Sequence, residues 1–251
     1  MKNKFYITTP IYYTNASPHL GHLYTTVLAD VLARHSRQNI KEQNVFFLTG
    51  TDEHGAKNVK AAEKAGKNIK EFIDENVAKF QELWQKLDIS NDDFIRTSDQ
   101  KKHWPTVQFL WKKLEEAGDI YKGNYPGLYC VGCEAFITKK DLVDGKCRDH
   151  DQKPELIEEE NYFFRLSKYS KKIEPLIKNN ELRIIPETRK NEILALLKEG
   201  LEDVSFSRPA KDISWGISVP GDASQTIYVW ADALSNYLSA LGYGTADNEK
   251  F

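Results

Sequence analysis

The chain has 251 residues, of which 40% are hydrophobic and 29% are charged, and its formal net charge is −2 at pH 7. This length can bury a substantial core and allows one large domain or a domain interrupted by another. The balanced charge provides no overall field that would attract nucleic acid, so any such contact must rest on a local patch. The N-terminus lacks a signal-peptide apolar segment, and no apolar run approaches membrane-spanning length. We therefore expect a cytoplasmic protein without membrane contact.

The first 50 residues predict a β-α-β unit. Residues 5–11 and 44–50 are short runs rich in β-forming residues that end in turn-forming chemistry, and a helical pattern lies between them. A crossover of this kind almost always places the two strands parallel in one sheet. Ligands collect at the carboxyl ends of such strands, which here carry residues 9–15 and 49–54.

The helix of this unit is expected to begin at the sequence Ser-Pro-His-Leu-Gly-His. Ser17 is the expected N-cap and Pro18 the first helical residue, which places His19 and His22 in the first turn. The helix should continue to about Gln38. Apolar residues at helical spacing predict one buried stripe, formed by Leu20, Tyr24, Val27, Leu28, Val31 and Leu32.

The remainder of the chain predicts further helices and a change of architecture near Ile120. From that point short pieces rich in tyrosine and glycine replace the long helical patterns, which indicates an inserted module. Helices are expected at about 56–66, 69–87, 100–117, 170–179 and 188–199, a strand pair at about 156–166, and a strand running into a helix over 225–241.

Three cysteines and a histidine have the spacing of a zinc site. Cys130 and Cys133 form one Cys-x-x-Cys pair. After thirteen intervening residues, Cys147 and His150 form a Cys-x-x-His pair. Each short turn directs two ligands to one point. Four protein ligands leave no position open for a substrate, so the ion would be structural. The alternative is a set of unrelated buried thiols with a surface histidine.

Several further motifs occur in a characteristic order: TTPIYYTNASPHLGH, FLTGTDEHG, the zinc pairs, ENYFFRLSKY, RKNEIL, SFSRP and YVWADALSNY. Together they resemble the methionyl-tRNA synthetases, a family of class I aminoacyl-tRNA synthetases, over nearly all of residues 4–243. The resemblance implies an α/β fold with a Rossmann-like parallel sheet. It also implies a catalytic domain that begins at 1–117, is interrupted by a zinc-bearing connective insertion at 118–224, and resumes at 225–251.

The resemblance also implies the site residues. His19, Gly21 and His22 match the family's ATP-binding His-x-Gly-His motif, in which the histidines stabilise charge as pyrophosphate leaves, and Arg208 matches the family arginine near the phosphates. A surface ion pair is the simpler interpretation of Arg208. The positions that match the family's methionine pocket are Ile11, Tyr13, Asp52, Trp230, Ala233 and Tyr237. Aromatic rings attract a thioether, and a carboxylate can pair with the substrate ammonium.

The implied reaction uses ATP with Mg²⁺ to convert methionine to methionyl-adenylate and then transfers the methionyl group to tRNA(Met). The family's Lys-Met-Ser-Lys-Ser loop does not occur in the 251 residues. We therefore expect a piece of a larger synthetase that is inactive alone and monomeric. One rival interpretation is another nucleotidyl-transferring protein with a His-x-Gly-His motif, including a leucine, isoleucine or valine synthetase, and the short insertion argues against those three. The other is a zinc-knuckle binding module without chemistry.

Overall fold

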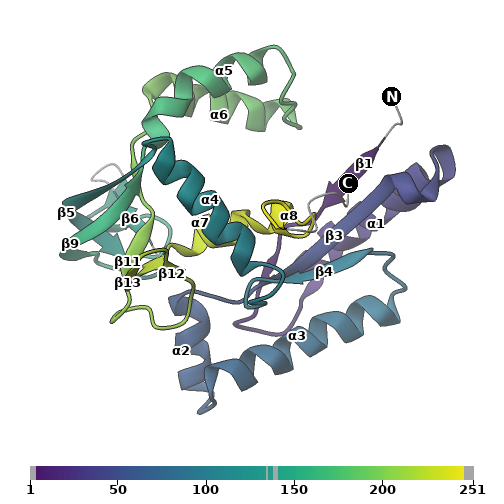
Figure 1. The fold of residues 1–251 in the computed structure, drawn as a ribbon, viewed down its shortest axis with the longest axis horizontal. Helices are drawn as coiled ribbons and strands as arrows, with labels where there is room; N and C mark the ends of the chain where they lie inside the picture. Colours follow the sequence, from purple (N-terminus) through teal and green to yellow (C-terminus); the bar gives the residue numbers. More distant parts are fainter. Residues whose placement is uncertain (1–3, 134, 138–140, 246–251) are drawn as a thin grey trace. The chain divides into compact units, whose positions relative to one another are not determined.

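The computed structural model describes residues 4–133, 135–137 and 141–245 (Figure 1). The chain forms two compact units: the first consists of residues 1–111 and 210–251, and the second of residues 112–209. The boundaries of these units differ from those of the insertion expected at 118–224, and that division into functional domains stays a prediction.

The elements of the first unit alternate between strand and helix in its amino-terminal part. They are β1 (Phe5–Thr8), β2 (Tyr12–Tyr13), α1 (Leu20–Asn39), a 3₁₀ turn (Glu42–Asn44), β3 (Val45–Asp52), α2 (Ala56–Lys64), α3 (Ile69–Lys86), β4 (Asp93–Arg96), β12 (Ser218–Val219), β13 (Asp222–Ile227), α7 (Val229–Leu234) and α8 (Asn236–Ser239). The helix α4 (Trp104–Glu116) crosses the boundary between the two units.

The second unit is mainly β-structure followed by two helices. Its elements are β5 (Ile120–Cys130), β6 (Ala135–Ile137), β7 (Leu142–Val143), β8 (Lys146–Cys147), β9 (Glu155–Phe164), a 3₁₀ turn (Leu166–Tyr169), α5 (Ser170–Lys178), α6 (Glu187–Glu199), β10 (Val204–Ser205) and β11 (Ser207–Pro209). The helices expected at 170–179 and 188–199 are confirmed.

A parallel sheet forms the centre of the first unit. β3 pairs in parallel with β1, β2 and β4, and its pairing begins at Val45 opposite Phe5 and ends at Asp52 opposite Tyr13. Because α1 connects the first strands to β3, the predicted β-α-β unit and the α/β fold class are confirmed. The carboxyl ends of these strands meet at one edge of the sheet, as parallel topology requires.

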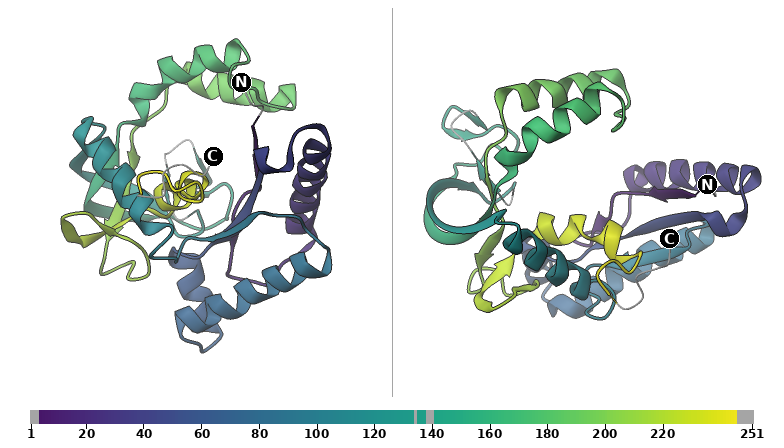
Figure 2. Two further views of the ribbon diagram at one scale, coloured as in Figure 1. Left: turned by 45° about the vertical axis from the view of Figure 1, so that its right-hand side comes forward. Right: turned by 45° about the horizontal axis from the view of Figure 1, so that its top comes forward.

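Alternate residues of β3 face opposite sides of the sheet, and both sides are covered. Phe47 packs with Ala33 of α1, whereas its neighbour Leu48 packs with Ala240, which follows α8. In the left view of Figure 2, α1 and the yellow α7–α8 segment lie on opposite sides of β3. This burial on both faces explains why β3 begins with four consecutive hydrophobic residues, Val45 to Leu48, rather than with an alternating pattern.

The stripe of α1 that was expected to face the core is on the other side of the helix. Its six residues are exposed by between 40% at Val27 and 81% at Leu20. The buried residues of α1 are Thr26, Ala29, Asp30 and Ala33. The prediction was wrong because α1 also carries a second stripe of small residues, which lets its backbone approach β3 closely.

The long antiparallel pair of β5 and β9 is the main feature of the second unit. Residues Ile120 to Tyr129 of β5 pair with Phe164 to Glu155 of β9, and β6 and β10 extend this sheet on either side. The strand pair expected at 156–166 is therefore wrong, since that segment is one strand whose partner lies in the glycine-rich and tyrosine-rich stretch. Local sequence patterns do not reveal the pairing of β5 with β9, because residues such as Ile120 and Phe164 are far apart in the chain.

The strand expected near residue 225 is β13, and it leads into α7 as predicted. Its partner in the first unit is the antiparallel β12, so this strand is not a member of the parallel sheet. Among the described residues, no helix combines the length and hydrophobicity needed to span a bilayer.

The close approach of β3 and β4 at Gly50 leads to a stability prediction. A methyl group at Gly50 would lie 2.1 Å from the carbonyl oxygen of Ile95, its partner on β4. Gly50→Ala should lower the free energy of unfolding by about 1–3 kcal/mol, because the strands must separate to admit the methyl group. Urea denaturation measures this loss.

The matched control is Gly123→Ala in β5, where the new methyl group would meet the ring of Phe163 at an ordinary 3.5 Å. We expect its free energy of unfolding to stay within about 0.5 kcal/mol of the wild-type value. Equal losses in both variants would show that the close approach at Gly50 does not limit the sheet.

Candidate functional site

The amino terminus of α1 is built by the two histidines of the His-x-Gly-His motif. His19 is the N-cap, and its Nδ1 accepts a hydrogen bond from the backbone N–H of Gly21 at 3.0 Å. The backbone N–H of His19 donates in turn to Nδ1 of His22 at 3.3 Å, which completes a reciprocal capping box. The N-cap expected at Ser17 is therefore wrong, and the helix begins at Leu20.

This capping box fixes which ring nitrogen carries the proton. An Nδ1 atom that accepts a hydrogen bond has no proton, so each neutral imidazole carries its proton on Nε2. The two rings are stacked with their centroids 3.7 Å apart. Burial, and then the neighbouring His19, lower the pKa of His22. The motif thus places two imidazole N–H donors at the positive end of a helix dipole, an arrangement that suits phosphate oxygens.

Gly21 is required for this stacking. A Cβ atom at Gly21 would lie 2.9 Å from Cε1 of His19. Any larger residue would therefore displace the His19 ring from its capping position, so the motif's glycine has a local structural reason in addition to the predicted contact with ATP.

The candidate amino-acid pocket lies at the carboxyl edge of the parallel sheet. Asp52 is the last residue of β3, is 4% exposed and lies opposite Tyr13. Ile11 and Tyr237 both pack against the core cluster of Leu48, Ile95 and Ala240. Burial raises the pKa of Tyr237, and the nearby charge of Asp52 acts in the same direction. The structure thus brings residues from both ends of the sequence to one edge.

The remaining predicted pocket residues lie on α7. Ala233 is buried, whereas Trp230 is 49% exposed. This half-exposed tryptophan is therefore not a buried core residue. An exposed indole can provide an apolar wall for a ligand.

Arg208 belongs to the second unit and is 5% exposed. Its Nη1 donates to Oγ of Ser205 and to the carbonyl oxygen of Ser207, each at 2.7 Å. Its guanidinium carbon lies 5.6 Å from the ring centroid of Tyr129. Arg208 is therefore buried, and the alternative interpretation as part of a surface ion pair does not apply.

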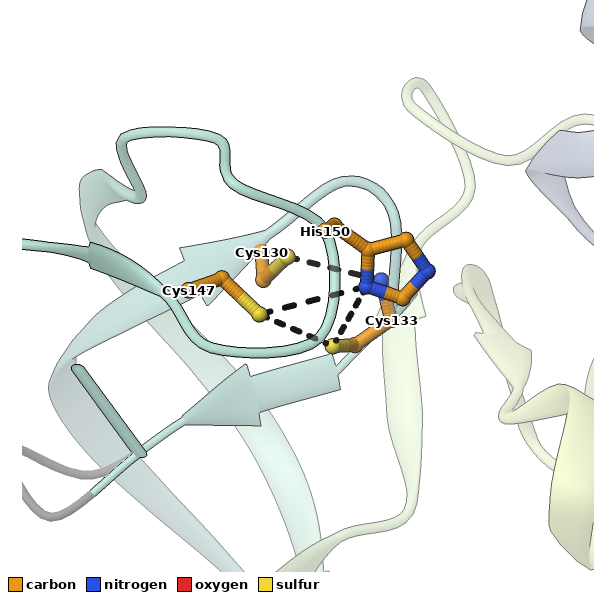
Figure 3. A group of neighbouring side chains, drawn as sticks. All are labelled: Cys130, Cys133, Cys147 and His150. Atoms are coloured by element: carbon orange, nitrogen blue, oxygen red, sulfur yellow. Dashed lines mark hydrogen bonds between the residues drawn. The ribbon is translucent and has the colours of Figure 1, made fainter. Parts of the chain in front are cut away.

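The four predicted metal ligands converge in the second unit (Figure 3). Each of them offers one ligand atom, and these atoms all lie within 4.8 Å of one another. Sγ of Cys133 is 3.5 Å from Sγ of Cys147 and 3.3 Å from Nδ1 of His150. Two sulfur ligands of a tetrahedral zinc ion are separated by about 3.8 Å, so the donor set and its spacing fit a metal ion.

Local backbone and electrostatics favour this convergence. A Cβ atom at Gly132 would lie 2.4 Å from Cγ of His150, so only glycine lets the histidine reach the cysteines. The hydrogen bond from His150 is the main cause that lowers the pKa of Cys147 to about 6. Burial, followed by the hydrogen bond with Cys147, raises the pKa of Cys133 to about 12. The thiolate form is therefore favoured at Cys147 and disfavoured at Cys133.

A buried cluster at the sheet edge was not assigned from the sequence. His54, His103 and Asp232 are each at most 2% exposed and form hydrogen bonds with one another through Asp232. His54 and Asp232 belong to the motifs FLTGTDEHG and YVWADALSNY, but only the fold shows that they meet. The position of His54 just after a predicted strand is the only feature of the sequence that could have suggested this cluster.

The parallel sheet and the motifs at its carboxyl edge are those expected of a class I tRNA synthetase, and comparison with known proteins shows that family. The family model for tRNA synthetases class I (M) matches residues 5–149 and 137–251. The chain belongs to this family, so the resemblance to methionyl-tRNA synthetases is confirmed.

Individual relatives carry a more specific name. The methionine–tRNA ligase of Caldanaerobacter subterraneus is 51% identical over 251 residues, which are 100% of this chain and 39% of that protein. The Thermotoga maritima methionine–tRNA ligase is 48% identical over 97% of this chain and 39% of its own length. The chain thus spans about two fifths of these curated relatives.

A solved structure agrees with the fold. The Mycobacterium tuberculosis methionyl-tRNA synthetase bound by methionyl-adenylate has a TM-score of 0.91 and 40% sequence identity, and the match covers 99% of this chain and 49% of that one. The similarity therefore extends over both units of the chain.

The capping box generates a pH prediction. The folded state lowers the pKa of His22, so the unfolded state binds more protons below about pH 6.5. The free energy of unfolding should therefore fall as the pH decreases from about 6.5 towards the lowered pKa, because protonation places a charge on a partly buried ring beside His19 and also removes the Nδ1 acceptor. Urea denaturation at several pH values measures this dependence.

The variant His22→Gln keeps a side-chain acceptor that does not titrate, as in ordinary capping boxes. We expect it to lose part of the acid-dependent decrease. His35→Gln removes a histidine from the same helix outside the capping box and should retain the decrease. An unchanged pH dependence in His22→Gln would contradict the assigned role of Nδ1.

Proposed function

We propose that the protein carrying this chain is a methionine–tRNA ligase. It would activate methionine with ATP and Mg²⁺ to methionyl-adenylate and transfer the methionyl group to tRNA(Met). The observation that carries the proposal is the 51% identity to a methionine–tRNA ligase over 100% of the chain. The carboxyl edge of the parallel sheet, where ligands of such folds bind, supports it.

The amino terminus of α1 supports ATP binding. The Nε2–H groups of His19 and His22 would donate to phosphate oxygens beside the helix dipole and stabilise the charge that develops as pyrophosphate leaves. Gly21 would let the nucleotide approach the backbone. Arg208 would add a cation near the phosphates, a role that rests on the family motif.

The sheet edge supports methionine binding. Asp52 would accept hydrogen bonds from the substrate ammonium, and its burial would strengthen this ion pair. Ile11, Tyr13, Trp230, Ala233 and Tyr237 would enclose the apolar side chain. Sulfur–aromatic contacts with Trp230 and the two tyrosines favour a thioether over a branched aliphatic side chain, which separates this proposal from a leucine, isoleucine or valine synthetase.

We also propose that Cys130, Cys133, Cys147 and His150 bind a structural zinc ion. Four protein ligands fill a tetrahedral shell, so the ion would hold together β5, the turn after it and the turn after β8 rather than contact substrate. A metal in the second unit alone would also suit a zinc-knuckle binding module. The identity over the first unit favours the synthetase.

Pyrophosphate exchange with each of the twenty amino acids tests the proposed function. The protein carrying this chain should exchange only with methionine at an appreciable rate. The 251 residues alone are proposed to be inactive, because the family's Lys-Met-Ser-Lys-Ser loop does not occur among them. We also propose that they are monomeric. Exchange that depends on another amino acid, or no exchange by the longer protein, would refute the proposal.

Asp52→Asn should weaken methionine binding strongly. The buried ammonium would lose its counter-charge at a cost of about 2–5 kcal/mol, which appears as a higher KM for methionine with a smaller change in the KM for ATP. Asp30→Asn is the matched control, since Asp30 is also buried but bonds to Ser90 and Arg34. It should reduce stability and leave the KM for methionine unchanged. A near-normal methionine KM in Asp52→Asn would contradict the assignment.

His150→Ala should abolish stoichiometric metal binding, because three cysteines alone leave the tetrahedral shell incomplete. Elemental analysis should find about one zinc per wild-type chain and much less in the variant. His35→Ala, which removes another exposed histidine, should retain the metal. Chelation at mildly acidic pH should lower the melting temperature of the wild type, and an unchanged melting curve after metal removal would argue against a structural ion.

A further inference from the structure

A buried cluster of ionisable groups connects three separate segments of the first unit. Oδ2 of Asp232 lies 2.5 Å from Nδ1 of His54, and Oδ1 lies 2.7 Å from Nε2 of His103. Nδ1 of His103 lies 2.8 Å from Oγ of Ser239. The cluster thus ties the turn after β3, the residue before α4, and the helices α7 and α8.

The hydrogen bonds of this cluster define its geometry. A carboxylate only accepts, so both imidazoles must donate to Asp232, one through Nδ1 and the other through Nε2. Burial raises the pKa of Asp232, but the charges and hydrogen bonds of the two histidines outweigh it, and the net pKa is lowered. The ring of His54 is shielded by Trp104 and Trp215, with centroids at 6.0 and 5.8 Å. Charge-assisted bonds in such a water-poor environment are short and directional.

Stability alone gives little reason to bury these groups. A buried ionic cluster is often no more stabilising than well-packed apolar residues of similar volume, because the charges lose their hydration. Directional bonds, in contrast, restrict position more narrowly than apolar packing does. The helices α7 and α8 have no side-chain hydrogen bond at their N-caps. Asp232 within α7 and Ser239 at the end of α8 instead anchor these short helices through the cluster.

Three of the four members of the cluster are close in sequence to a residue of the proposed methionine pocket, and His103 is the exception. His54 follows Asp52 by two positions, Asp232 lies between Trp230 and Ala233, and Ser239 follows Tyr237 by two. We propose that Asp232 is a positioning residue which, through His54 and His103, fixes the α7–α8 wall of the pocket relative to Asp52. This inference rests on the proposed methionine specificity and adds to it the groups that set the pocket's width.

The test compares two substitutions at His54 in the protein carrying this chain. His54→Asn places an amide N–H near the position of Nδ1 and should retain the bond to Asp232, whereas His54→Leu removes the donor at similar size. We expect His54→Leu to raise the KM for methionine by about tenfold or more, with the KM for ATP nearly unchanged, because a small displacement of one wall misplaces the binding groups. His54→Asn should restore most of the methionine affinity.

A second pair of substitutions, at His103, keeps the test decisive if His54→Leu does not fold. His103→Gln places an amide near Nε2 and should behave like the wild type, whereas His103→Leu should show the selective rise in methionine KM. A loss of melting temperature with both KM values unchanged would mean a purely structural cluster and would overturn the proposal. Absence of methionine-dependent exchange in the wild type would instead refute the proposed function, and the positioning role with it.

Discussion

Parallel strands joined by a helix must end at the same edge of their sheet, and this constraint determines where the candidate residues of the first unit can lie. The pairing of β3 with β1, β2 and β4 brings Asp52, Tyr13 and the turn before α1 to one edge. The buried residues of α1 and β3 fix this arrangement through small side chains that allow close packing. The edge then carries charge and hydrogen-bonding groups that would be costly to bury elsewhere.

Two acidic residues follow each other at this edge, and their surroundings separate their roles. Glu53 is completely buried and accepts a bidentate pair from Arg96, through Nε at 2.8 Å and Nη2 at 2.9 Å. This pair neutralises Glu53 and joins the end of β3 to β4. Asp52 lies opposite Tyr13 instead. This position supports the recognition role that we propose for Asp52 from the family motif, whereas Glu53 supports the structure.

Much of the fold could be predicted from the sequence, because local patterns identify most helices and the β-α-β unit. The failures have physical causes. Periodicity detects the stripes of α1 but cannot decide whether Leu20 and Tyr24, or Ala29 and Ala33, face the sheet. Long-range pairing is equally invisible to local patterns, and so the β5–β9 pair was missed.

The site shows the same limit. The convergence of the three cysteines and His150 could be predicted because short spacings place them in two turns. The family motifs predict the roles of Asp52 and the histidines of α1, which stay predictions. The meeting of His54 with Asp232, which are 178 positions apart, depends on the tertiary fold. The N-cap at His19 was missed because histidine is an unusual cap, and its role appears only when His22 returns the bond.

The central claim is that the carboxyl edge of the parallel sheet recognises methionine. A crystal structure of the protein carrying this chain with bound methionine tests it most directly. We expect the substrate ammonium to lie at about 3 Å from the carboxylate of Asp52, with the thioether against the ring of Trp230. Methionine bound away from this edge, or with its ammonium paired to another group, would contradict the proposed methionine site.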